Sequence, residues 1–379
     1  MSAIEERVLP AWGDWPSPKE ARPWTVGIEE EVMLLHASDF ALAPWIDSIL
    51  PTLAAHLAEH VDAETHGSAL ELRTGVHASV PAALGELATL RRELQGELAD
   101  RGLRAAAAGM HPTTVWQETR ISGGERYQLL YASLRELARR EPTFALHVHV
   151  AVPDPEDALR AMNGLREHLP LLLALSANSP FWQGRETGLA STRTPMFGAF
   201  PRVGLPRAFT DYGDYVESID LLLRCGAFPE PTFMWWDVRL QPRWGTVEVR
   251  IMDAQITIED SAGLVALVQS LVHMEAGDGA GAPAAQGSAE LLAENRFLAA
   301  RDGMQAQFLD PVREGQISAH EVLSSTLAAC APHAEELGCR DELEAARELS
   351  RSPGARRQRE RAREAAGLAG LVASLADAF

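Results

Sequence analysis

Polar and apolar residues alternate in several short stretches of this sequence, and we interpret these stretches as strands. The clearest is 25–35, TVGIEEEVMLL, an apolar run that contains three consecutive glutamates. Because successive strand side chains point to opposite faces, Glu29 and Glu31 are expected on one face and Glu30 on the other. Similar patterns predict further strands at 69–74, 103–109, 143–152, 233–240 and 245–252.

Between these strands, apolar residues recur every three or four positions, which predicts amphipathic helices. The stretch 79–101 is typical, with Leu84, Leu87, Leu90 and Leu94 on one stripe. The other predicted helices are 41–60, 123–140, 153–179, 209–225 and 259–275, followed by further helices up to the C-terminus.

These elements suggest four parts of the chain. Residues 1–23 are rich in proline and are predicted to form an extended arm. Residues 24–276 hold all the predicted strands and form the expected catalytic domain. The stretch 277–288, GDGAGAPAAQGS, is of low complexity and is expected to be a flexible linker. Residues 289–379 are expected to be C-terminal helices packed on the same domain.

Composition narrows the functional classes. The chain has 379 residues and a formal net charge of −19, so it lacks the basic surface that a nucleic-acid partner requires. Its three cysteines are far apart, which favours a reducing compartment, and we expect the cytoplasm. The N-terminus is acidic, unlike a signal peptide. No apolar run reaches the roughly 18–20 residues of a membrane span, so no membrane partner is expected.

The like-facing glutamates suggest a metal site. Side chains two positions apart on a strand lie about 6.6–7 Å apart, so Glu29 and Glu31 repel each other unless a cation lies near them. Glu64 and Glu71 flank the HGS turn and could face the same pair. The alternatives are ordinary: an edge strand whose charges prevent aggregation, a solvated turn at Glu64, and an exposed strand position at Glu71.

Two histidines mark the strand 143–152, TFALHVHVAV. His147 and His149 are two positions apart in an otherwise apolar strand, so both rings are expected on one face. Imidazole is a common metal ligand, although a core histidine is more often satisfied by a backbone carbonyl. His111, which precedes Pro112, is interpreted as a turn residue.

Charged residues also share faces on the last two predicted strands. Glu248 and Arg250 alternate with valines in TVEVRIMD, and Asp237 and Arg239 alternate in the strand before it. The simplest interpretation is a cross-strand network of ion pairs.

The loop-like stretch 181–206 has many glycines and prolines, and arginines punctuate it and its C-terminal flank. Guanidinium groups bind phosphates and carboxylates, so anion binding is one interpretation and a solvated loop is the other. The arginines are Arg185, Arg193, Arg202 and Arg207.

Taken together, the GIEEE strand, the Glu64/Glu71 pair, the HVH strand and the TVEVRIMD strand resemble, in order and spacing, the carboxylate–amine ligases of the glutamate–cysteine ligase type 2 family. The resemblance covers about 25–275. It implies an α+β fold of the glutamine synthetase/guanidino kinase type: a curved antiparallel sheet backed by helices, with a helical C-terminal portion.

The same resemblance implies a set of site residues. Mg²⁺ or Mn²⁺ ions would be held by Glu29, Glu31, Glu64, Glu71, His147 and Glu248. Arg250, Arg193 and Arg202 would be catalytic, and Arg250 and Arg193 would also bind ATP. No role is implied for His149.

The leading functional hypothesis is therefore an ATP-dependent ligase that activates a carboxylate as an acyl phosphate and joins it to an amine. Glutamate and cysteine are the substrates that the family name suggests, and a homodimer is the assembly it suggests. Two alternatives stay open: a guanidino-kinase-like phosphotransferase, and a catalytically silent paralogue that binds a nucleotide or an amino acid.

Overall fold

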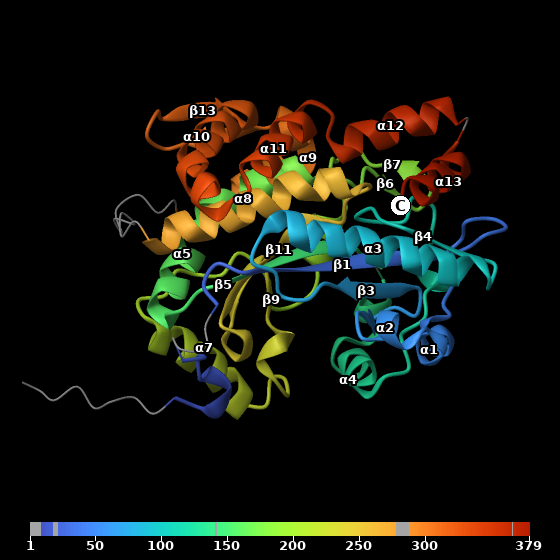
Figure 1. The fold of residues 1–379 in the computed structure, drawn as a ribbon, viewed down its shortest axis with the longest axis horizontal. Coiled ribbons are helices and arrows are strands. Elements are labelled where there is room, and N and C mark those ends of the chain that lie inside the picture. Colours follow the sequence, from blue (N-terminus) through green and yellow to red (C-terminus); the bar gives the residue numbers. More distant parts are fainter. Residues whose placement is uncertain (1–8, 18–21, 141, 278–287, 366) are drawn as a thin grey trace, which may run out of the picture.

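The computed structural model of the protein describes residues 9–17, 22–140, 142–277, 288–365 and 367–379. Within these ranges the central feature is a seven-stranded sheet whose neighbouring strands are all antiparallel (Figure 1). The strand order is β10-β11-β5-β1-β3-β2, and β4 pairs with the C-terminal half of β1. The strands are β1 (Val26–His36), β2 (Val61–Ala63), β3 (Ala69–Arg73), β4 (Leu103–Ala106), β5 (Ala145–Ala151), β10 (Val238–Gln241) and β11 (Thr246–Asp253).

Three long helices cover one face of this sheet. Ile28 and Val32 of β1 are buried on that face, in a hydrophobic core that also contains Leu87, Leu165 and Leu264 from the helices. The helices are α3 (Val80–Ala99), α5 (Pro155–Ser176) and α8 (Ile258–Gly277), and Figure 1 shows α3 and α8 along the same side of the sheet. The expected antiparallel sheet backed by helices is confirmed.

Glu30 also points to the helix-covered face, as the alternation predicts. It is fully buried, and Arg91 of α3 donates from Nε to its Oε2 at 2.7 Å. The same guanidinium donates to the carbonyls of Gln255 at 2.9 Å and Ile256 at 3.0 Å. Arg91 therefore connects α3 with β1, through Glu30, and with the segment that follows β11, through the two carbonyls.

The C-terminal helices form a further layer, seen in orange and red at the top of Figure 1. Leu327 and Leu343, from the first two helices after a hairpin, share the main hydrophobic core with α8. The hairpin of β12 (Gln307–Asp310) and β13 (Gly315–Ser318) was not predicted, whereas the helical C-terminal portion is confirmed. The helices are α9 (Ala289–Asp302), α10 (Ala319–Leu337), α11 (Arg340–Arg351), α12 (Gly354–Glu364) and α13 (Leu368–Ala378).

The division into domains stays a prediction, and most of the expected linker lies outside the described residues, as do parts of the expected N-terminal arm. The described part of the arm contains a short 3-10 helix, η1 (Ala11–Gly13). No helix in the described residues is both long and apolar enough to cross a membrane.

Several predicted elements are wrong in extent. The helix expected at 41–60 is broken into α1 (Ile46–Ile49), η2 (Leu50–Thr52) and α2 (Ala55–Ala58), because Pro51 cannot donate the hydrogen bond that would continue α1. The strand expected at 233–240 is interrupted and splits into η5 (Pro231–Phe233), β9 (Trp235–Trp236) and β10. The helix expected at 123–140 ends earlier, as α4 (Glu125–Leu134) followed by η4 (Arg135–Arg139).

The stretch 181–206 is mostly irregular, as expected, with a few short elements. A two-residue turn joins β6 (Phe181–Trp182) to β7 (Arg185–Glu186) in a hairpin, and α6 (Arg193–Phe197) follows. β8 (Val203–Gly204) then pairs with β9. The predicted helix at 209–225 is α7 (Tyr212–Arg224), and its N-cap Asp211 accepts a hydrogen bond from the backbone of Asp214. Two further 3-10 turns, η3 (Trp116–Glu118) and η6 (Pro242–Trp244), lie in connections, and η7 (Gly303–Gln305) follows α9.

Candidate active site

The face of the sheet opposite the helices carries a ladder of charged side chains. Glu29 of β1 lies opposite His147 of β5, and Glu31 lies opposite Glu71 of β3. One strand further, Glu248 of β11 lies opposite His149. Antiparallel partners directly opposite each other project to the same side, so the four adjacent strands β11, β5, β1 and β3 bring these groups onto one surface.

These residues form three overlapping clusters in which the ligand atoms of each cluster lie within 4.8 Å of one another. Glu29 belongs to two of the clusters, and Glu71 also belongs to two, so the three are linked in a chain. The clusters are Glu29, His149 and Glu248; Glu29, Glu71 and His147; and Glu31, Glu64 and Glu71. The structure therefore brings together all six residues proposed as metal ligands and adds His149.

The histidines pair with the glutamates of β1. His147 Nδ1 lies 3.3 Å from Glu29 Oε2, and His149 Nε2 lies 3.4 Å from Glu29 Oε1. The Nε2 atoms of both rings are buried and form no hydrogen bond with the described residues. Buried imidazole nitrogens beside several carboxylates are a donor set that suits a hard divalent cation such as Mg²⁺ or Mn²⁺.

Like charges dominate the end of the chain of clusters near β3. Burial and the neighbouring Glu31 raise the pKa of Glu64 to about 7. Burial, with Glu29, Glu64 and Glu31 around it, raises the pKa of Glu71 well above its ordinary value. A divalent cation among these carboxylates would offset their repulsion, which again fits the residues present.

Glu248 lies in a different environment, because cationic side chains surround it. It is fully buried, and Arg239 Nε and Gln241 Nε2 each donate to its Oε2 at 2.7 Å. Arg239 also donates to Oε1 at 3.3 Å, and Arg250 pairs with the same oxygen. Although burial alone would raise it, the pKa of Glu248 is held well below its ordinary value by these two guanidinium groups.

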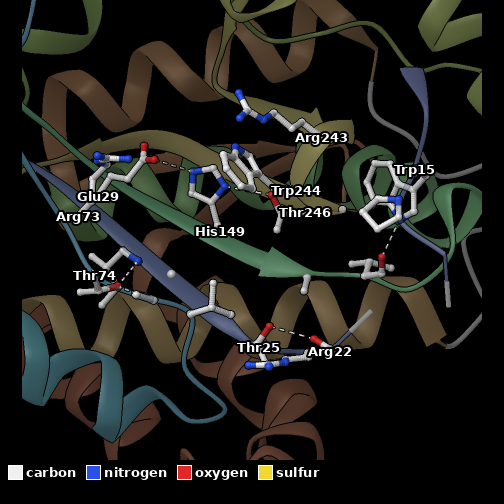
Figure 2. Close-up of a pocket in the computed structure, with 18 residues that line it drawn as sticks. Trp15, Arg22, Thr25, Glu29, Arg73, Thr74, His149, Arg243, Trp244 and Thr246 are labelled. Atoms are coloured by element: carbon white, nitrogen blue, oxygen red, sulfur yellow. Dashed lines mark hydrogen bonds and ion pairs between the residues drawn. The ribbon is translucent and has the colours of Figure 1, made fainter. Parts of the chain in front are cut away.

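Two cavities flank the clusters and share Glu29 and Arg243 in their linings. The larger, of about 640 Å³, is lined by the carboxylates Glu31, Glu64 and Glu71 and by Arg250. The smaller, of about 370 Å³, is more apolar (Figure 2). In Figure 2, Glu29 and His149 lie at one side of this smaller cavity and Trp15 at the other.

Arg250 lines the larger cavity beside the clusters, but Arg193 and Arg202 line neither cavity. Arg193 is buried and donates to the backbone carbonyls of Arg250 and Ile251 at 3.2 and 3.0 Å. Arg202 donates to the carbonyl of Phe233 at 3.1 Å. The catalytic roles proposed for both residues, and ATP binding by Arg193, stay predictions; in the structure both guanidinium groups donate to neighbouring backbone.

Sequence reasoning did not identify several residues at the site. Arg239 was expected only in a cross-strand network, and it does pair with Glu248 across β10 and β11. Arg126 and Tyr127 of α4 line the larger cavity, and Arg243 lines both cavities. Arg126 lies on the charged face of a predicted helix, and such a face does not distinguish a site residue from a solvated one. Arg243 lies in the turn before TVEVRIMD, and this position next to a predicted site strand could have indicated a role for it.

Comparisons with known proteins identify the family of this chain. A family model described as "Glutamate-cysteine ligase family 2(GCS2)" matches residues 25–371. A protein of Rubrobacter xylanophilus named "Putative glutamate--cysteine ligase 2-1" is 40% identical over 342 residues, covering 89% of this chain and 90% of that protein. A protein of Sorangium cellulosum named "Putative glutamate--cysteine ligase 2" is 36% identical, covering 86% of this chain and 88% of that protein.

Solved structures show the same fold at low sequence identity. The glutamate–cysteine ligase of Francisella tularensis, solved in complex with AMP, superposes with a TM-score of 0.67 at 13% identity and covers 93% of this chain and 87% of that chain. A bifunctional glutathione synthetase from Pasteurella multocida gives a TM-score of 0.69 at 15% identity, covering 93% of this chain and 52% of that one. With the family model matching most of the chain, this protein belongs to the glutamate–cysteine ligase family 2.

Proposed function

We propose that the protein is an ATP-dependent carboxylate–amine ligase that forms an amide through an acyl phosphate. The observation that carries the proposal is the chain of three carboxylate and imidazole clusters between two cavities. Family membership supports ligation over simple phosphotransfer. The clusters also retain every proposed metal residue, which speaks against a catalytically silent paralogue.

The residues that would hold divalent cations are Glu29, Glu31, Glu64, Glu71, His147 and Glu248, with His149 as a further candidate. Bound Mg²⁺ or Mn²⁺ would neutralise phosphate oxygens and so favour phosphoryl transfer. The smaller, more apolar cavity suits the base of ATP, and the larger cavity suits the two organic substrates.

We assign Arg250 to stabilising the transferred phosphoryl group, and its partly buried position in the lining of the larger cavity, beside Glu248 and His147, supports this role. In the first step a carboxylate oxygen attacks the γ-phosphorus, the bond to the β-phosphate oxygen breaks, and ADP leaves. In the second step the amine nitrogen attacks the acyl carbon, and inorganic phosphate and a proton leave. Glutamate and cysteine are the first acid and amine to test.

The experiment uses hydroxylamine, a small nucleophile that traps acyl phosphates as hydroxamates. The wild-type protein with ATP, Mg²⁺ and its acid substrate is expected to form hydroxamate and ADP in equal amounts. Arg250→Lys is expected to lower the rate by about 10²–10³-fold, because a compact ammonium cannot replace a fork of parallel donors.

A matched control is Arg207→Lys, since Arg207 pairs with Asp214 at the surface and lines neither cavity. It should behave like the wild type. Release of AMP and pyrophosphate would contradict the proposal by indicating an acyl adenylate. A phosphorylated acceptor formed with ADP but without amide would instead favour the phosphotransferase alternative.

A further inference from the structure

The larger cavity has a second, apolar side that the proposed chemistry does not use. Phe197, Phe200, Phe233 and Trp235 all line this cavity together with the site carboxylates. Their rings contact one another in a row: the centroids of Phe197 and Phe200 are 5.4 Å apart, those of Phe200 and Trp235 are 6.4 Å apart, and those of Phe233 and Trp235 are 5.8 Å apart. We refer to these four residues as the aromatic wall.

Two segments far apart in the sequence build the aromatic wall, and backbone contacts hold them together. Phe197 and Phe200 come from α6 and the turn after it, and Phe233 and Trp235 come from η5 and β9. The segments are joined by the parallel pairing of β8 with β9. Arg202 reinforces the junction, because it donates to the carbonyl of Phe233 and its guanidinium lies 5.1 Å from the ring centroid of Trp235.

The charge nearest to the aromatic wall is already paired. Arg126 lies over the ring of Phe233 at 4.7 Å, but its guanidinium forms an ion pair with Glu230 and donates to Thr232 Oγ1 at 3.0 Å. Phe233 is buried, whereas Phe197, Phe200 and Trp235 are only partly buried. Partly exposed rings that face a cavity gain free energy when an apolar group covers them.

From this arrangement we propose that the aromatic wall binds an aliphatic or aromatic side chain on one of the two organic substrates. The inference rests on the proposed ligase function and narrows its substrate class. A substrate would place its reacting carboxylate or amine toward the clusters and its apolar portion against the wall. Hydrophobic pockets of this kind discriminate between side chains by about 10- to 200-fold for each methylene group.

The experiment has two arms, because the apolar side chain could belong to the acid or to the amine. In the first arm, hydroxamate and ADP are measured with hydroxylamine as the amine and with glutamate, acetate, hexanoate and 3-phenylpropionate as acids. In the second arm, the best acid is combined with glycine, alanine, cysteine, leucine and phenylalanine. At least one arm is expected to show a preference of 10-fold or more in kcat/KM for the apolar side chains.

Phe200→Ser is expected to reduce that preference, measured as the ratio of kcat/KM for the apolar and the smallest substrates, by at least 10-fold. Phe297→Ser is the matched control, because Phe297 is an exposed aromatic residue of α9 that lines neither cavity. It should keep the preference of the wild type. Circular dichroism and thermal unfolding would verify that both variants are folded.

The outcomes separate the two proposals. The role of the aromatic wall would be overturned if ADP release were equally fast with small and large side chains in both arms. It would also be overturned if Phe200→Ser left the preference intact. Either result would leave the ligase function standing. No hydroxamate and no ADP with any pair of substrates would overturn the ligase function, and the role of the aromatic wall with it.

Discussion

Replacing Glu71 with glutamine should affect stability in opposite directions with and without a divalent cation. Glu71 lies within 4.8 Å of Glu31 and Glu64 in one cluster and of Glu29 in another. At that separation and an effective dielectric constant of 20, each pair of ionised carboxylates repels by about 3 kcal/mol. The protein relieves part of this cost by raising the pKa of Glu71, so the observable effect of one substitution is smaller.

In EDTA, Glu71→Gln should therefore be at least as stable as the wild type, by about 0–2 kcal/mol, because an amide keeps the volume and removes one like charge. With Mn²⁺ or Mg²⁺ the order should reverse. A cation present at 100 times its Kd stabilises the wild type by about 2.7 kcal/mol, and a variant that has lost a ligand gains little. Urea unfolding at pH 8, with EDTA and with increasing Mn²⁺, measures both quantities.

Glu217→Gln provides the control, since Glu217 is an exposed residue of α7 that pairs with Arg224. Its response to Mn²⁺ should equal that of the wild type. The hypothesis of a metal cluster would be refuted if Glu71→Gln kept the full stabilisation by the cation. If Glu71→Gln instead lowered the free energy of unfolding in EDTA by several kcal/mol, Glu71 would be a structural residue that stabilises the fold without a cation.

Two buried groups away from the site, His111 and the Arg91–Glu30 pair, give further predictions about stability. Burial lowers the pKa of His111 to about 4, and its neutral ring accepts hydrogen bonds from the backbone of Thr114 and lies 2.9 Å from the carbonyl of Phe40. Since the unfolded chain takes up this proton near pH 6.5, His111 should lower the free energy of unfolding by up to about 3 kcal/mol as the pH drops from 6.5 to 4. In urea titrations His111→Gln should remove this contribution and leave that of His66, because burial also lowers the pKa of His66 to about 4. Arg91→Met leaves the carboxylate of Glu30 buried without its cation and should cost about 3–5 kcal/mol in the same assay; a change below 1 kcal/mol would contradict the role of this pair.

How far the sequence predicts the site follows from the geometry of strands. The alternation of side chains correctly assigned Glu29 and Glu31 to one face of their strand, and His147 and His149 to one face of theirs, because this rule depends only on neighbouring residues. The pairing itself depends on contacts between distant segments, so the sequence could not place Glu71 opposite Glu31. The family resemblance supplied that link.

The errors have a related origin. Helical periodicity at 41–60 outweighed Pro51, where the helix is broken, although α5 and α10 each continue through an internal proline, Pro170 and Pro332. The stretch 181–206 was interpreted from its glycines, prolines and arginines, and anion binding by it stays a prediction, while buried Arg193 donates to the carbonyls of β11. Composition indicates that guanidinium groups are present, but only tertiary structure decides whether they face a ligand or the backbone.

Glu248 and Arg250 show how one pair can serve both the fold and the chemistry. A carboxylate has about four lone-pair sites, and those of Glu248 meet two donors from Arg239, one from Gln241 and one from Arg250. Glu248 can therefore bind a cation only if one of these donors moves away. Arg239 and Arg250 both line the larger cavity, but Arg239 also donates to the backbone carbonyls of Thr232 and Met234 at 2.9 and 2.7 Å, so Arg250 is the donor that is less tied to the backbone. Binding of a cation at Glu248 and release of Arg250 toward a phosphoryl group are thus expected to be coupled, which would make Arg250 available when the substrate complex is assembled.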